Sequence, residues 1–310
     1  MKPSRLPSFF IATVALVFVL VVWGGIVRLT GSGLAIPDWP LAHGRVVPRP
    51  ETRVIIEYVH RVLAMLVGLM TLGLAVAVYA SPRYRRPLGA TMAMALLVLA
   101  IQIFMGGRIV LEELLVQRVV VHLLLAFVFF AIMLRMTLQA QDVAHRGSVV
   151  AGVGGTKAPG PNGGPEGARK TRQLRAWSLA VAGLVFLQAG LGAWVSSSGA
   201  SLACPDFPTC QGTFFPRMEG LVGIHYSHRL GAYLVFAAVL ALSIRAAMVP
   251  LPPRARLPLR LAGILVTLQM ILGIGNVVLG LPLAISAGHL ATALALFGTL
   301  LVANHELSRL

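Results

Sequence analysis

The chain has 310 residues, of which 57% are hydrophobic and 12% charged, and its net charge is +16. A soluble domain carries about a quarter charged residues, so this composition argues against a soluble globular, disordered or fibrous protein. It is typical of an all-α membrane protein. The basic residues lie in short loops between apolar runs, which is a signature of membrane topology and not of nucleic-acid binding.

A helix that crosses a bilayer needs about 20 predominantly apolar residues. The first such run, 8–27, follows Lys2 and Arg5 and has no small-residue cleavage site after it, so we expect an uncleaved helix. The last run, 261–304, contains no charged residue and is too long for one span, and we expect Pro282 to divide it. The eight predicted spans are 8–27, 54–80, 87–107, 117–138, 176–196, 221–248 and the two parts of 261–304.

The distribution of positive charge predicts the orientation. Eight spans place both termini on one side of the membrane, and the larger share of the 26 Lys and Arg residues falls on that side. Both termini are therefore expected in the cytoplasm. The cytoplasmic segment 139–175 contains GVGGTKAPGPNGGPEGARK and is expected to be a flexible linker. It separates an N-terminal bundle, 1–138, from a C-terminal bundle, 176–310.

An internal repeat relates the two halves. Residues 24–48 read GGIVRLTGSGLAIPDWPLAHGRVVP, and residues 192–216 read GAWVSSSGASLACPDFPTCQGTFFP. One constant spacing carries Asp38 onto Asp206 and His60 onto His228. We therefore expect two tandem four-helix bundles with the same orientation, which is a parallel repeat.

Four of the eight histidines lie inside predicted spans at repeat-equivalent positions: His60, His122, His228 and His289. Ionisable groups inside a span are costly and usually functional. Each half thus offers two imidazoles near the outward ends of its helices, which suits two axial ligands of one haem iron. Arg61, Arg229 or loop arginines are candidate partners of the haem propionates. The alternative is that these histidines are hydrogen-bonded packing residues.

The two halves differ at one position beside these histidines. Glu57 stands where the second half has His225. Because Glu57 lies three residues before His60, we expect both to face one cavity, where a carboxylate is a candidate general base or cation-stabilising group. The alternative is an ion pair with Arg53 or Arg61. His225 is either a neighbour of the second site or an alternative ligand. The asymmetry suggests one haem that reacts and one that carries electrons.

The two cysteines lie in the second outward loop. Cys204 and Cys210 flank CPDFPTC, and the matching places in the first loop hold Ile36 and Ala42. An extracytoplasmic pair at this spacing favours a disulfide. Either a structural staple or a redox-active pair would account for it.

The chain resembles the heme A synthase family of bacteria and mitochondria over nearly its whole length. The motifs that carry the resemblance are GGIVRLTGSGLAIPDWPLAHG, EYVHR at 57–61, QIFMGGRIV at 102–110, CPDFPTCQG at 204–212, HYSHR at 225–229 and GHLATA at 288–293. Together they are specific, although each alone is weak. The family fold is similar to the architecture expected above, with eight helices in two four-helix bundles.

The resemblance implies an activity. Members of the family oxidise the C8 methyl group of heme O through a hydroxylated carbon and a gem-diol to the formyl group of heme A. The substrate-side histidine pair of the family falls on His60 and His122, and its haem b pair falls on His228 and His289. The family's glutamate falls on Glu57, as a proton acceptor or cation stabiliser. The second haem would relay electrons.

The chain departs from many bacterial members, which carry a cysteine pair where Ile36 and Ala42 stand. The resemblance then implies that Cys204 and Cys210 form a stabilising disulfide outside catalysis. Implied partners are heme O, membrane lipid, an electron donor and a heme O synthase, in a bacterial plasma membrane, and a homo-oligomer is compatible. The competing interpretations are a diheme electron-transfer cytochrome and a transporter with proton-relaying histidines.

Overall fold

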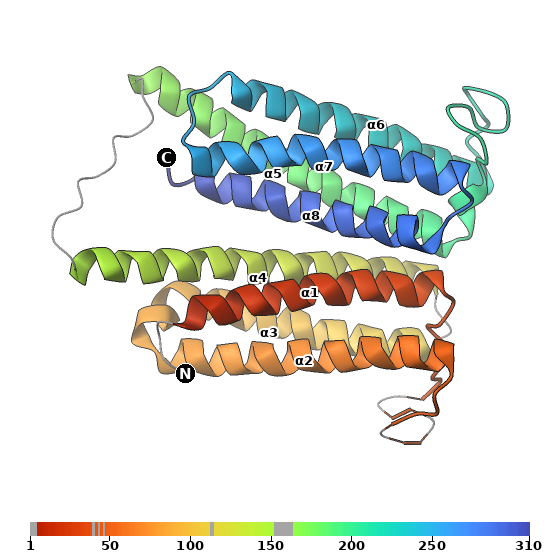
Figure 1. Ribbon diagram of the computed structural model, residues 1–310, viewed down its shortest axis with the longest axis horizontal. Helices are drawn as coiled ribbons and strands as arrows, with labels where there is room; N and C mark the ends of the chain where they lie inside the picture. Colours follow the sequence, from red (N-terminus) through yellow and green to blue (C-terminus); the bar gives the residue numbers. More distant parts are fainter. Residues whose placement is uncertain (1–4, 39–40, 43, 46, 112–114, 152–163) are drawn as a thin grey trace. The chain divides into compact units, whose positions relative to one another are not determined.

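The computed structural model of the chain describes residues 5–38, 41–42, 44–45, 47–111, 115–151 and 164–310, with the side chains of 146–151 excepted. Its eight α-helices are α1 (Leu6–Leu29), α2 (Thr52–Ala80), α3 (Pro82–Leu111), α4 (Val116–Ala151), α5 (Gly164–Ser197), α6 (Gly220–Ala247), α7 (Pro253–Val278) and α8 (Leu283–Leu307) (Figure 1). A short 3₁₀ helix, η2 (Ala200–Leu202), follows α5. The described residues contain no strand, so the predicted all-α class is confirmed.

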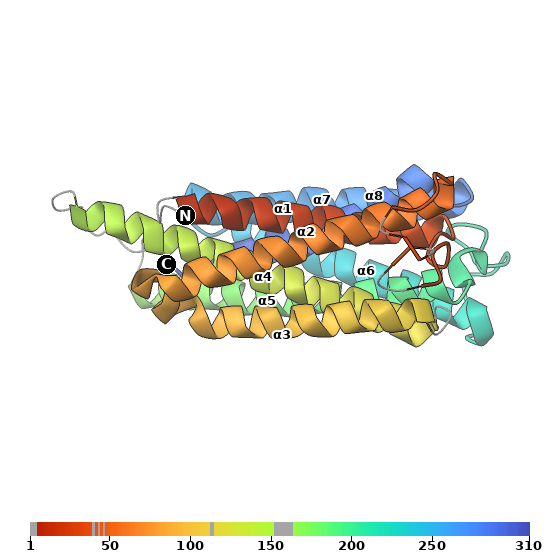
Figure 2. The ribbon, with the colours of Figure 1, turned by 90° about the horizontal axis from the view of Figure 1, so that it is seen from below.

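All eight helices are long and apolar enough to cross a membrane. Their most apolar windows have mean hydropathies between 1.7 and 2.7, and only 17% to 39% of each window is buried inside the protein. A helix that is apolar on nearly all sides and yet packed on a minority of them presents its remaining surface to lipid. Figure 2 shows α1, α2 and α3 extending along the same long axis.

The predicted division of 261–304 is confirmed. Helix α7 ends at Val278, and α8 begins at Leu283 after Pro282, whose φ is −58°. Gly280 and Leu281 between them have φ values of 68° and 63°, in the left-handed region that ends a helix. Because proline fixes its own φ and lacks an N–H group, it can open α8 but cannot continue α7.

The helices extend beyond the predicted spans on both flanks of the expected linker. Helix α4 continues to Ala151, and α5 already begins at Gly164. The Arg83 guanidinium donates to the carbonyls of Val143 and Ala144 at 2.7 and 3.2 Å, beside the extension of α4. The part of the expected linker at 152–163 lies outside the described residues.

The chain clusters into two compact units, Met1–Arg118 with Leu125–Ala158, and Val119–Leu124 with Pro159–Leu310. In the first unit, the Trp23 indole donates to the carbonyl of Ile56 at 2.9 Å and ties α1 to α2. The rings of Phe18 and Phe130 lie 6.4 Å apart and join α1 to α4.

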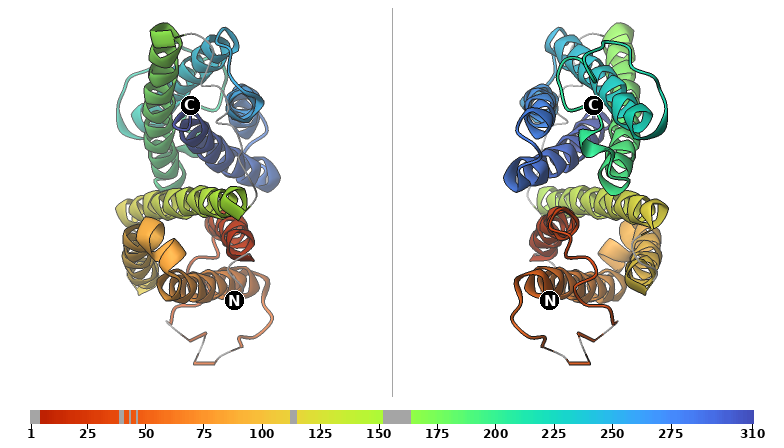
Figure 3. Two further views of the ribbon diagram at one scale, coloured as in Figure 1. Left: turned by 90° about the vertical axis from the view of Figure 1, so that its left-hand side faces the viewer. Right: turned by 90° about the vertical axis from the view of Figure 1, so that its right-hand side faces the viewer.

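In the second unit, α5 packs against α6 and α8, and α7 packs against the same two helices. These four helices therefore surround a common centre, as the end-on views show (Figure 3). The ring centroids of Phe186 on α5 and Phe297 on α8 lie 6.2 Å apart, which joins these two helices. At the far end of the same pair, the Asn304 amide donates to the carbonyl of Arg175 at 2.8 Å and to the hydroxyl of Ser178 at 3.2 Å.

The Asn304 link gives a stability prediction. Replacing Asn304 by alanine removes two interhelical hydrogen bonds between α5 and α8, and we expect the free energy of unfolding in detergent to fall by about 1 kcal/mol. Thr267→Val is the matched control, because the Thr267 hydroxyl bonds within α7 to the carbonyl of Gly263. Equal stability of the Asn304→Ala variant and the wild type would contradict the prediction.

Candidate functional site

The four histidines singled out from the sequence lie in the first three turns of their helices: His60 on α2, His122 on α4, His228 on α6 and His289 on α8. All four side chains are half-buried. His228 on α6 and His289 on α8 both belong to the second unit. His60 belongs to the first unit, and His122 belongs to the segment Val119–Leu124 that clusters with the second unit.

Three of the imidazoles pack edge-on against a glycine of another helix. A Cβ atom placed on Gly24 of α1 would lie 3.0 Å from Cε1 of His60, and one on Gly192 of α5 would lie 3.0 Å from Cε1 of His228. A Cβ on Gly273 of α7 would lie 3.1 Å from Cε1 of His289. Only glycine allows this approach of helix backbone and ring, so these glycines fix where each ring can sit. Sequence reasoning missed this role.

The ring nitrogens have unequal surroundings. Nδ1 of His60 and Nδ1 of His289 are buried and have no hydrogen-bond partner among the described residues. Nδ1 of His228 lies 2.9 Å from the amide nitrogen of Gln188. The amide nitrogen of Gln269 lies 3.3 Å from Nε2 of His289. His228 and His289 are thus each contacted by one glutamine amide, whereas Nδ1 of His60 has no such contact among the described residues.

This donor set fits a haem. A porphyrin already binds its iron through four nitrogens, so two imidazoles complete the coordination. Each imidazole here is half-buried on a membrane-spanning helix, where an unsatisfied ring nitrogen is unfavourable. In the second unit, His228 and His289 are the two imidazoles of one four-helix bundle that would hold the iron.

Arg61 and Glu57 hold the loop between α1 and α2. The Arg61 guanidinium donates to the carbonyls of Ile36, Asp38 and Leu41 at 2.8 to 2.9 Å. It also donates to Oε1 of Glu57 at 2.7 Å, and Oε2 of Glu57 accepts from the Ile36 N–H at 2.8 Å. Glu57 is only 3% exposed. The ion pair with Arg61, one of the two sequence interpretations of Glu57, is therefore present, and both carboxylate oxygens are engaged.

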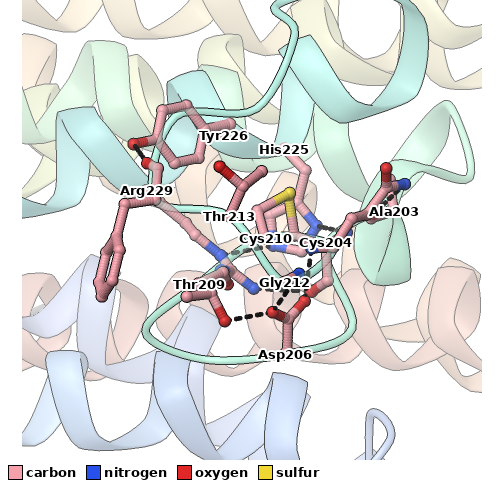
Figure 4. Close-up of a disulfide and its surroundings, with 12 residues drawn as sticks. Ala203, Cys204, Asp206, Thr209, Cys210, Gly212, Thr213, His225, Tyr226 and Arg229 are labelled. Atoms are coloured by element: carbon pink, nitrogen blue, oxygen red, sulfur yellow. Dashed lines mark hydrogen bonds between the residues drawn. A yellow bond between two sulfur atoms is a disulfide. The ribbon is translucent and has the colours of Figure 1, made fainter.

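Arg229 and His225 hold the loop between α5 and α6 in the same way (Figure 4). The Arg229 guanidinium donates to the carbonyls of Cys204 and Thr209 at 2.7 and 2.8 Å. Its Nε lies 3.3 Å from Nε2 of His225, and the Cys204 N–H lies 3.3 Å from Nδ1 of His225. A carboxylate can accept both bonds, whereas a neutral imidazole accepts at one nitrogen only, which accounts for the longer distances at His225.

These two loop clamps were not foreseen. The sequence suggested Arg61 and Arg229 as propionate partners, and in the structure both guanidinium groups face loop carbonyls. The signal that could have revealed the clamps is the constant spacing itself, since it carries Ile36, Glu57 and Arg61 onto Cys204, His225 and Arg229.

The predicted disulfide between Cys204 and Cys210 is present, with Cα atoms 4.5 Å apart. The Asp206 carboxylate inside this ring accepts from the N–H groups of Gln211 and Gly212 at 2.6 and 3.0 Å and from the Thr209 hydroxyl. The Thr209 hydroxyl, and then the Gly212 and Gln211 N–H groups, lower the pKa of Asp206 from 3.8 to about 2. Disulfide, carboxylate and Arg229 together fix the loop across the end of the bundle (Figure 4).

The depressed pKa predicts a pH dependence for the loop. The ordering that Asp206 contributes is fully present above its unfolded pKa and is lost as the pH falls from about 4 through 2. At pH 7, Asp206→Asn is expected to speed hydrogen exchange in the loop peptide several-fold. Glu219→Gln makes the same charge change at an exposed site of that loop and should leave exchange unchanged. Unaltered exchange in Asp206→Asn would show that the carboxylate does not order the loop.

The chain is similar to known proteins over most of its length. The family model COX15-CtaA, described as cytochrome oxidase assembly protein, matches residues 8–55 and 51–301. A heme A synthase of Nitrosospira multiformis is 29% identical over 342 residues, covering 95% of this chain and 91% of the relative. A heme A synthase of Halalkalibacterium halodurans is 31% identical over 241 residues, covering 75% of this chain and 73% of the relative.

A heme A synthase of Rhizorhabdus wittichii is 26% identical over 357 residues and covers 99% of this chain and 95% of the relative. The family model thus spans nearly all of the eight helices that hold the four histidines. The chain therefore belongs to the COX15-CtaA family of cytochrome oxidase assembly proteins.

Proposed function

We propose that the protein is a heme A synthase, a membrane oxidoreductase that converts the C8 methyl group of heme O into the formyl group of heme A. Relatives of that name cover most of the chain, and they favour this enzyme over a diheme electron-transfer cytochrome. The observation that carries the proposal is the imidazole held edge-on against a helix glycine in both units, at Gly24 and His60 and at Gly192 and His228.

The two halves take different roles in this proposal. His228 and His289 hold a resident haem b in the C-terminal bundle, and His60 and His122 hold heme O as substrate in the N-terminal bundle. Haem b, when bound, supplies one-electron redox chemistry. The protein residues orient the two tetrapyrroles, exclude water with apolar helix surfaces, and close the ends of the bundles with the two clamped loops.

The proposed division rests on an internal duplication. The same contacts recur at corresponding residues: Arg61 and Arg229 reach loop carbonyls, and Glu57 and His225 each lie beside the arginine and a loop N–H group. Isolated β-bridges recur at Ala42 with Arg45 and at Cys210 with Thr213. These parallels support two tandem bundles of common ancestry and, with the charge distribution, both termini in the cytoplasm of a bacterial cell.

Oxidation of a methyl group to a formyl group proceeds by two hydroxylations and the loss of one water. With water as the source of the added oxygen, the net reaction releases four electrons and four protons from the methyl group and the water together. Protons need an acceptor near the reacting carbon, and Glu57 is the carboxylate three residues from His60. Arg61 and the Ile36 N–H each occupy one lone pair of its oxygens, so a proton taken up by Glu57 would weaken its ion pair with Arg61. The four electrons need an acceptor, which the haem of the C-terminal half would reach as a one-electron relay, and a heme O synthase would supply the substrate.

The second half supplies a substitution that separates the two roles of Glu57. Glu57→His copies the residue that holds the C-terminal loop, so we expect the variant to fold and to retain heme O. It lacks the carboxylate, and we expect heme A formation to fall by at least about a hundredfold. The measurement is haem analysis of membranes from cells that also make heme O. His225→Glu, the reciprocal change, is the control and should retain activity.

Heme A formation at the wild-type rate in Glu57→His would restrict Glu57 to holding the loop. Absence of heme A from membranes that contain heme O and the wild-type chain would contradict the proposed function itself.

A further inference from the structure

Gln188 of α5 makes two contacts with one histidine. Its amide nitrogen lies 2.9 Å from Nδ1 of His228 and 2.7 Å from the carbonyl oxygen of the same residue. The amide group therefore bridges the ring and the backbone of His228, and it fixes the ring relative to α6. Gly231, one turn further along α6, makes room, because a Cβ atom there would clash with Oε1 of Gln188.

The N-terminal half has no counterpart of this pair. The spacing that carries His60 onto His228 carries Leu20 onto Gln188 and Leu63 onto Gly231. Correspondingly, Nδ1 of His60 is buried with no hydrogen-bond partner among the described residues. The glutamine and the glycine that accommodates it thus occur together in one half, and two leucines occupy both places in the other.

A hydrogen bond to the second nitrogen of a metal-binding imidazole fixes its tautomer and orientation and changes its basicity. The side-chain amide has both a donor and an acceptor end. In the structure the nitrogen end faces Nδ1, which is therefore the acceptor and leaves the ring proton on Nε2. A ring that binds iron through Nε2 carries its proton on Nδ1, so in that state the amide turns to present Oε1 as the acceptor and gives up its bond to the His228 carbonyl.

We propose that Gln188 is a positioning residue that acts through His228 to set the reduction potential of the haem in the C-terminal half. The proposal rests on the proposed function, because it assumes a haem bound by His228. It assigns a physical origin to the difference between the halves: the electron-carrying side has a polar amide behind one ligand, and the substrate side has leucine. In this proposal Gln188 acts through its contacts with His228 and not by direct contact with substrate or iron.

The test is a redox titration of the C-terminal haem in purified full-length protein. Gln188→Leu removes the acceptor, so His228 becomes a weaker base, and we expect the reduction equilibrium to shift about tenfold toward the reduced form, or about 59 mV. Gln188→Glu supplies a stronger acceptor and should shift the equilibrium in the opposite direction. Ser243→Ala is the control: it removes a hydrogen bond from α6 to the carbonyl of Leu259, about four turns from His228.

Opposite shifts in the two variants, with no shift in the control, would support the proposal, since a packing defect would shift both variants alike. Equal shifts, or none, would overturn it. If the wild-type chain binds no haem, the proposed function fails. Nitrogen NMR of His228 in the haem-free chain then tests the contact that underlies the inference: Nδ1 should show a hydrogen-bond shift that is lost in Gln188→Leu, and an unchanged Nδ1 resonance would overturn it.

Discussion

The architecture depends on placing imidazoles inside helices that otherwise contain apolar side chains. An ionisable group within a membrane span is unfavourable unless its polar atoms find partners. Gln188 and Gln269 contact two of the rings, and Nδ1 of His60 and of His289 has no partner among the described residues. Gly24, Gly192 and Gly273 let neighbouring helices approach three ring edges. The ring nitrogens then remain available for a ligand that is itself apolar over most of its surface.

The second requirement is a closed end for each bundle. The side chains of Arg61 and Arg229 extend from their helices to donate hydrogen bonds to loop carbonyls. Each guanidinium also contacts a residue one helical turn earlier, Glu57 for Arg61 and His225 for Arg229. The two sets of contacts lie at corresponding positions of the repeat, but the arginine partner is a carboxylate in one half and an imidazole in the other. A carboxylate accepts two hydrogen bonds and carries charge, whereas an imidazole accepts one. In the proposed function, this difference would distinguish the reacting half from the electron-carrying half.

Much of the fold followed from sequence, because hydropathy and proline are local signals. The spans and the break at Pro282 are examples. The helical flanks at 139–151 and 164–175 were missed because polar residues hide a helix from a hydropathy criterion, although pairs such as Glu166 and Lys170, 2.7 Å apart, support one. The contact of Gln188 with His228 depends on how α5 faces α6, and no local pattern shows that.

The site was only partly predictable for a related reason. The four histidines stood out because charge-bearing rings are rare in apolar spans and because the repeat paired them. The arginines beside them were assigned to propionates, since sequence cannot tell a guanidinium that faces a ligand from one that faces a loop carbonyl. Only the three-dimensional path of each loop brings Ile36 to Glu57 and Cys204 to His225.

The most direct test of the account is haem extraction, with chromatography and mass spectrometry, from purified wild type, His60→Ala and His228→Ala in cells that make heme O. The account predicts haem B together with heme O or heme A in the wild type. It predicts loss of heme O and heme A alone in His60→Ala, and loss of haem B in His228→Ala. Two equivalents of haem B without heme O or heme A, or no haem of any kind, would contradict it.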